Sequence, residues 1–310
     1  MLCLIGLVLV NAQSYRGFTG FSVIDTEFFE IIYPEESLGT ARLLQSMADD
    51  VYREASEELD LYADSKIPVC ISGHTEEFNG YMNLFPYPHI MLFDTPMDSE
   101  WTSFPNSLRS LFKHELVHAL SLTTRSKGFS VFHTIFGGWV SPALLNSPFF
   151  MIEGVTVSLE STDGYGRVND PLVRQHIRQA VWEDKALTPF QASGVYDLPP
   201  FGKSYYEYGG LFSDFIQRNY GMEKYQELWK AIGKAPFYSL FFYRSAFYRI
   251  FSKIFDEPFL DVWNEFLESY RPEQLETNNQ NILYDGELLI SAIDTHEDAV
   301  FILDTISSSI

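Results

Sequence analysis

Two histidines one helical turn apart set the strongest condition on the fold of this chain. Residues 111–120 have the sequence LFKHELVHAL, with His114 and His118 four apart and Glu115 directly after the first histidine. On a helix, side chains at i and i+4 share a face, so both imidazoles can reach one zinc ion. Glu115 is displaced by about 100° around the helix, where it can act as general base on a water activated by the metal. The alternative is a core helix whose histidines are hydrogen-bonded.

A catalytic zinc site needs a third protein ligand and an open position for water. Glu153 lies near the start of a second predicted helix, FFMIEGVTVSLE, and the apolar residues before it would bury the start of that helix. Gly154 would let the motif helix approach closely. Glu160 lies seven residues further on, on the same face, and is expected to support the site from outside the ligand set. The downstream candidates for the third ligand are His133, Glu153, Glu160, Asp163 and Asp170.

The other candidates are weaker on chemical grounds. Asp163 and Asp170 flank GYGRVN, which is expected to be a turn and a poor place for a ligand with tight geometry. A metzincin would need its third histidine at position 124, which is Thr124, so His133 is expected on the surface or in a lid. The remaining histidines have no partner at ligand spacing and are expected to play no part in the site: His74, His89, His176 and His296.

Two further features suit acyl-transfer chemistry. The segment SYYEYGG offers Tyr206 and Tyr208 at a helix start, and either hydroxyl could stabilise an oxyanion. The segment HIMLFDTP, bounded by Pro88 and Pro96, is expected to be an edge strand to which an extended peptide could add.

The order of predicted elements indicates an α+β fold, with a mixed sheet and helices followed by a helical half. Strands are expected at FFEIIYP and KIPVCIS, and a single amphipathic helix over residues 37–62, capped by Ser37. The motif helix is expected to be capped by Asn106 or Ser107. From about residue 150 onward five helices are expected, and the aromatic run FYSLFFYRSAFYRIFSKIF is expected to pack in the core.

Composition and charge limit the partners of the protein. The chain is 46% hydrophobic with a net charge of −21, which indicates a globular protein. No basic cluster is present to neutralise phosphates, so neither nucleic acid nor an anionic lipid surface is an expected partner.

The N-terminal segment MLCLIGLVLVNA is typical of a signal peptide, with cleavage expected after Ala12. Export to a periplasmic or extracellular location would follow, with Cys70 left as the one cysteine, a small core residue without a disulfide partner. A buried first strand is the alternative for this segment. No other segment is expected to span a membrane.

The last part of the chain has a different residue pattern from the helical segments before it. Residues 276–310 alternate polar and apolar side chains around a turn at Asp285-Gly286, as in part of a β-propeller blade. One incomplete blade cannot bury its faces alone, so the chain is expected to be a fragment of a longer protein. The alternative is that these strands dock on the first domain.

Taken together, the segments KHELVHAL, FFMIEGVTVSLE and YYEYGGLFSDFIQRNYG resemble the gluzincin metallopeptidases, a group that includes thermolysin and the aminopeptidase N family. The second segment is similar to the pattern W-x-x-E-G-x-A-x-x-x-E, and the third to a Y-E-x-G segment followed by a helix ending in Tyr-Gly. The resemblance is strongest to peptidase MA-like domains that precede TolB-like propellers, and it covers roughly residues 25–270.

The resemblance implies a zincin-like domain over residues 13–275, between the signal peptide at 1–12 and the blade-like tail at 276–310. His114, His118 and Glu153 would be zinc ligands, Glu115 the base and Tyr206 the hydroxyl that polarises the carbonyl. The G-x-M-E-N element that holds a free N-terminus in aminopeptidases is not visible, so endopeptidase action on a peptide or protein is expected. The alternative is a catalytically silent scaffold module whose propeller contacts a protein partner.

Overall fold

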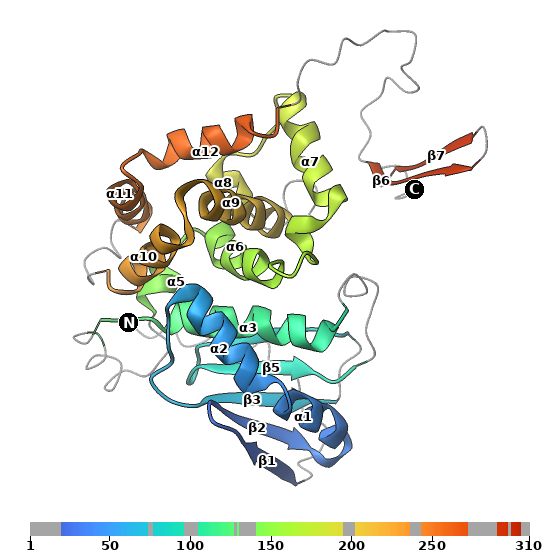
Figure 1. Ribbon diagram of the computed structural model, residues 1–310, viewed down its shortest axis with the longest axis vertical. Coiled ribbons are helices and arrows are strands. Elements are labelled where there is room, and N and C mark those ends of the chain that lie inside the picture. The colour runs from blue at the N-terminus through green and yellow to red at the C-terminus, as the bar shows by residue number, and fades with distance from the viewer. Residues whose placement is uncertain are drawn as a thin grey trace, which may run out of the picture.

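The computed structural model describes residues 20–73, 77–95, 105–126, 129, 141–194, 202–235, 243–271, 290–296 and 299–304. A mixed β-sheet with two covering helices forms one half of the molecule, and a group of helices forms the other (Figure 1). The helix that carries the HELVH motif lies between the two halves. The α+β class predicted from the sequence is confirmed at this level.

The sheet is five-stranded, with three parallel strands in the middle and an antiparallel strand on each side. Ile31, Val69 and Ile90 stand side by side across the central strands, and each is fully buried. Cys70, on the opposite face of its strand from Val69, is only half-buried rather than a full core residue. The strand order is β1 (Phe21–Asp25), β2 (Phe29–Pro34), β3 (Ile67–Ser72), β5 (His89–Phe93) and β4 (Gly80–Asn83).

The predicted edge strand is an interior strand. HIMLFDTP forms β5, and β4 covers its outer side with Gly80 opposite Leu92 and Asn83 opposite His89. The edge therefore belongs to β4, whose sequence GYMN is too short to show a hydrophobic alternation.

The helix expected over residues 37–62 is in fact two helices, α1 (Leu38–Gln45) and α2 (Ala48–Leu59). Ser37 makes no side-chain cap to α1. The break lets the first turn of α2 reach the turn between β1 and β2, where Asp49 accepts hydrogen bonds from the Thr26 hydroxyl (2.8 Å) and the Phe28 amide (3.2 Å). A continuous helix could not make this contact and still cover the sheet.

The motif helix, α3 (Ser107–Thr123), is capped by Asn106, whose side chain accepts from the amide of Arg109 at 3.0 Å. Both sides of α3 are covered, and every residue from position 111 to 122 is buried. Lys113 is among them, and its ammonium is 2.6 Å from a carboxylate oxygen of Glu54 and 3.2 Å from the Thr162 hydroxyl. These bonds fix α3 to α2 and to the turn that follows the next long helix.

The second half is helical, as predicted. Its elements are α5 (Pro142–Asn146), α6 (Phe149–Glu160), the 3-10 turn η3 (Arg167–Asn169), α7 (Pro171–Trp182), α8 (Pro189–Ala192), α9 (Ser204–Tyr220), α10 (Met222–Gly233), α11 (Tyr243–Phe255) and α12 (Phe259–Glu268). The aromatic run is core within its described part, since Phe247 and Phe251 are fully buried. Its residues before position 243 lie outside the described residues.

Helices α6 and α9 touch backbone to backbone at a glycine contact. A Cβ atom on Gly209 would lie 2.0 Å from the Phe150 carbonyl oxygen, and one on Gly154 would lie 2.3 Å from the Gly209 carbonyl oxygen. Gly154 therefore makes room for α9 and not, as predicted, for the motif helix. The contact brings the starts of α6 and α9, which carry Glu153 and Tyr206, close together.

The predicted blade-like tail is described only as an antiparallel hairpin of β6 (Ile290–His296) and β7 (Ala299–Asp304). The turn at Asp285-Gly286 and the signal segment at residues 1–12 lie outside the described residues. Among the described helices, none has both the length and the apolar character needed to cross a bilayer.

Candidate metal centre

The side chains of His114, His118 and Glu153 converge between α3 and α6. The Nε2 atoms of the two histidines lie 3.6 Å and 3.2 Å, respectively, from the same oxygen, Oε2 of Glu153. One ligand atom from each of the three residues lies within 4.8 Å of the others, and all three residues are buried. The two histidines of the motif and the predicted third ligand, Glu153, thus form one cluster in space.

The cluster has the chemistry and dimensions of a zinc site. Ligand atoms about 2.1 Å from zinc in a tetrahedron are about 3.4 Å apart, close to the observed separations of 3.2 and 3.6 Å. Among the described residues, Oε2 of Glu153 has no hydrogen-bond donor although it is buried. A buried carboxylate oxygen without a donor is costly, and a cation would satisfy it. The residues therefore fit zinc.

Electrostatics inside the cluster are dominated by the ion pairs. Burial alone would raise the pKa of the Glu153 carboxyl, but the charge of His118 and the closeness of both histidine nitrogens hold it well below its usual range. Burial would likewise lower the pKa of His114, yet its contact with Glu153 and its hydrogen bond to Glu160 raise it to about 10. In the metal-free protein a proton thus occupies the place that a metal would take.

Glu160 supports His114 from the side away from the ligand cluster. Its side chain is fully buried, and its Oε2 lies 2.7 Å from Nδ1 of His114. A proton on Nδ1 then bonds to Glu160 and leaves Nε2 free to face Glu153. Nδ1 of His118 has no such partner among the described residues, so this support is given to one histidine alone.

Glu115 lies under the edge strand β4. A Cβ atom on Gly80 would be 3.4 Å from its Cγ, an ordinary contact distance, so Glu115 packs directly against β4 at this residue. Burial raises the pKa of the Glu115 carboxyl above its usual value, and the neighbouring Glu153 raises it further, although the charges of the two histidines and a hydrogen bond from the Met82 backbone oppose this. A raised carboxyl pKa suits a group that must accept and return a proton near neutral pH.

The two candidate tyrosines point in different directions. The ring of Tyr206 lies 6.3 Å from the ring of His114. Tyr208 is turned into the core, where its ring stacks on Trp263 and its hydroxyl accepts a hydrogen bond from the Leu187 amide at 3.2 Å. Tyr206 is thus the one of the pair that faces the cluster.

The other candidates lie away from the cluster. Asp163 is exposed, 3.6 Å from Arg109, and Asp170 caps α7 by accepting from the Leu172 amide at 2.8 Å. His89 contacts the Tyr87 carbonyl, and His176 is 3.2 Å from Glu207. His74 and His133 lie outside the described residues, and the side chain of His296 is not described.

Two residues near the site were missed by the sequence analysis. The Thr156 hydroxyl donates to the Glu153 carbonyl at 2.6 Å and lies 3.2 Å from Nε2 of His114. Its position one helical turn from Glu153 could have indicated it. Arg167 lies between Glu160 and the ring of Tyr206. No local signal marks it, because it belongs to a turn that follows the helix of Glu160 but is distant in sequence from the helix of Tyr206.

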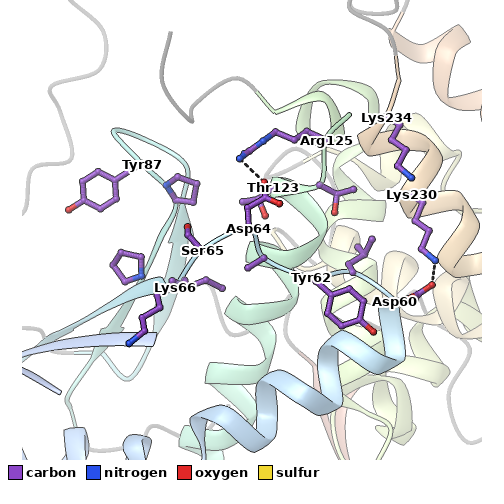
Figure 2. A pocket seen from close by; sticks show the side chains of 16 residues that line it. Asp60, Tyr62, Asp64, Ser65, Lys66, Tyr87, Thr123, Arg125, Lys230 and Lys234 are labelled. Carbon is purple, nitrogen blue, oxygen red and sulfur yellow. Dashed lines mark hydrogen bonds and ion pairs between the residues drawn. The ribbon is translucent and has the colours of Figure 1, made fainter. Parts of the chain in front are cut away.

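A separate cavity of about 390 Å³ opens at the C-terminal end of α3, lined by residues 60–68, Tyr87, Pro88, 123–125, Lys230 and Lys234. Figure 2 shows that acidic neighbours pair with two of its basic side chains, Arg125 with Asp64 and Lys230 with Asp60. None of the clustered metal-site residues lines it. It is therefore not part of the candidate centre.

This chain is similar to known proteins in sequence and in structure. No family model matches it. It is 32% identical over 251 residues to an uncharacterized protein of Treponema pallidum (strain Nichols), a match that covers 80% of this chain and 21% of that protein. The chain thus spans about a fifth of the length of this relative. Native yeast LTA4 hydrolase is similar in structure with a TM-score of 0.44 and 14% identity, over 78% of this chain and 38% of that one.

Proposed function

We propose that this chain is a zinc-dependent peptidase that acts as an endopeptidase on peptides or unfolded proteins. The observation that carries the proposal is the convergence of His114, His118 and Glu153 at tetrahedral separations, with Glu115 on the same helix beside them. When bound there, zinc would supply Lewis-acid activation of the scissile carbonyl and of a water molecule.

The remaining steps belong to the side chains of the protein. Glu115 takes the proton of the attacking water as oxygen adds to the carbonyl carbon, and delivers it to the nitrogen as the C–N bond breaks. Tyr206 donates a hydrogen bond to the oxyanion that forms. Glu160 keeps His114 in the tautomer whose Nε2 faces the cluster.

The strand β4 gives the substrate a place to bind. It is the outer strand of the sheet beside α3, and Glu115 lies against it at Gly80. An extended peptide added along this edge would run past Glu115, and main-chain hydrogen bonds would hold it without reference to a free terminus. This supports internal cleavage over removal of terminal residues.

The test combines metal content with hydrolysis. We expect purified protein to contain about one zinc per chain and to cleave casein, an unstructured substrate. Glu115→Gln should keep its zinc and lose at least about two orders of magnitude in kcat, the contribution expected of a general base. As a matched control, Glu227→Gln changes an exposed glutamate on α10 and should leave both measurements unchanged.

Each outcome has a defined meaning. If the wild-type protein is well folded but contains no zinc, the interpretation that remains is a metal-free structural domain. Zinc without hydrolysis of any unfolded protein would favour the silent scaffold, although an intact Glu115 has no use in such a module. Full activity in Glu115→Gln would remove the proposed mechanism.

Two wider proposals concern the two ends of the chain, which lie wholly or partly outside the described residues. We propose that the chain is exported, with a mature N-terminus at Gln13, and N-terminal sequencing of protein from an extracytoplasmic fraction would check this. We also propose that residues 276–310 belong to a propeller completed by further sequence, through which a protein partner binds.

A further inference from the structure

Arg167 stands between two residues of the candidate site. Its guanidinium carbon lies 4.6 Å from the centre of the Tyr206 ring, within the range of a cation–π contact. On its other side, its Nη1 lies 3.7 Å from Oε1 of Glu160, whose side chain is fully buried. One cation therefore faces both the proposed oxyanion donor and the carboxylate behind a metal ligand.

These contacts close a circuit of four side chains from four different elements. Glu160 on α6 contacts His114 on α3 at 2.7 Å, and His114 faces Tyr206 on α9 with the rings 6.3 Å apart. Arg167 on η3 joins Tyr206 back to Glu160. The ring of Tyr206 is thus contacted by Arg167 and by the ring of Tyr205 (4.4 Å between centroids), and His114 approaches it from α3.

The backbone around Arg167 is fixed independently of these contacts. The side-chain Nδ2 of Asn169 donates to the Ser161 carbonyl at the end of α6 (2.7 Å), and Arg174 on α7 donates from Nε to the Val168 carbonyl (2.8 Å). Gly166, before the arginine, has a φ of 85°, a conformation that favours glycine. The turn is therefore built to present residue 167 at one place.

We infer that Arg167 is a positioning residue for Tyr206, an inference that rests on the proposed peptidase function. Its planar guanidinium holds the ring by its face, and its ion pair with Glu160 anchors the guanidinium in turn. The positive charge beside the phenol also makes the hydroxyl a better donor to a developing oxyanion. Arg167 acts through Tyr206 and does not itself touch the substrate.

The kinetic test replaces Arg167 and, for comparison, Arg174, an arginine of α7 that hydrogen-bonds to the same turn. Arg167→Met should lower kcat about tenfold with KM changed less than about twofold, the loss expected for one partly buried cation–π contact. The kcat of Arg167→Lys should fall between the values for wild type and Arg167→Met, because lysine keeps the charge without the planar face. Arg174→Met removes one support of the turn but leaves the guanidinium of Arg167 in the protein, so it should lower kcat less than Arg167→Met does, by about threefold at most.

A double-mutant cycle separates positioning from general loosening. In a Tyr206→Phe background, Arg167→Met should cost less than about twofold, since its effect passes through the hydroxyl. An unchanged tenfold cost in that background would overturn the inference. Equal losses in Arg167→Met and Arg174→Met would also overturn it, since both would then reflect only a damaged turn.

A second measurement needs neither turnover nor substrate. In protein labelled at the tyrosine 13Cζ position, the Tyr206 signal is identified as the one missing from Tyr206→Phe. Arg167→Met should shift this signal more than any other tyrosine signal, and Arg174→Met should not. If wild type cleaves no peptide but this shift appears, the proposed function fails while the contact stands. If the signal does not move, the positioning role fails whatever the activity.

Discussion

One carboxylate oxygen of Glu160 lies 2.7 Å from Nδ1 of His114, while Nε2 of the same ring faces Glu153 at 3.6 Å. The two glutamates of α6 thus divide between the two nitrogens of one histidine. Because a histidine binds a metal through one nitrogen and orients itself through the other, the two glutamates should give different results when removed.

We expect Glu153→Ala to lose most bound zinc, because two histidines alone leave the site one ligand short. Glu160→Ala should keep zinc and lose about ten- to a hundredfold in activity, the range known for partners behind a ligand. Zinc-to-protein ratios of the two variants, measured side by side with wild type, decide between them. Full zinc occupancy in Glu153→Ala would mean that the motif helix binds metal through another residue.

Tyr206→Phe and Tyr208→Phe should separate catalysis from stability. Tyr206→Phe should lower kcat by about 10²-fold with little change in KM, as for loss of one oxyanion donor. Tyr208→Phe leaves the half-buried Leu187 amide without its acceptor, and should cost about 1 kcal/mol in unfolding free energy with near-normal kcat. Kinetics and urea unfolding on both variants measure this, and a reversed pattern would reassign the donor.

The metal-free protein should lose stability as pH rises toward 10. The pKa of His114 is raised from 6.5 to about 10, so its contribution is fully present below pH 6.5 and disappears as pH passes through about 10. With a chelator present, the difference in urea midpoint between wild type and His114→Asn should therefore shrink between pH 6 and pH 10. A difference that stays constant over this interval would show that the ring is not held protonated. His89→Asn, outside the cluster, provides the comparison.

Gly209→Ala should destabilise the protein strongly. Its Cβ atom would lie 2.0 Å from the Phe150 carbonyl oxygen, so α6 and α9 would have to move apart, at a cost of about 3 kcal/mol or more. Gly39→Ala in α1 meets nothing within 4 Å and should instead raise stability by about 0.5 to 1 kcal/mol. Thermal melts of the two variants give the comparison, and similar melting temperatures would contradict the close helix contact.

Gly80→Ala tests the contact between the edge strand and the base. The added methyl would lie 2.9 Å from the Met91 carbonyl oxygen, so β4 must shift, and Glu115, whose Cγ would be 3.4 Å from the methyl, packs against this strand. We expect kcat to fall about tenfold or more while zinc content is retained, because small displacements of catalytic groups have large effects. Loss of zinc together with activity would point to general damage and not to displacement of Glu115.

Local sequence determined those features that depend on neighbours along one helix. The spacing of His114 and His118 is enough to place both rings on one face, because helical geometry repeats regardless of context. Asn106 as cap and the separation of the helices after residue 150 follow from similarly local rules. The choice of Glu153 over the aspartates around GYGRVN also rested on which residues a helix holds rigidly, and the structure brings it to the histidines.

The tertiary structure decided everything that depends on how elements meet. Sheet order is such a property: the segment of β5 is bounded by Pro88 and Pro96, as an edge strand would be, but the four residues of β4 take the edge instead. Tyr206 and Tyr208 are nearly equivalent in sequence, and only the roll of α9 on α6, fixed by Gly154 and Gly209, turns the first toward His114. Arg167 approaches Tyr206 from a turn far along the chain. Such contacts join residues that share no helical or strand period, so no pattern in the sequence records them.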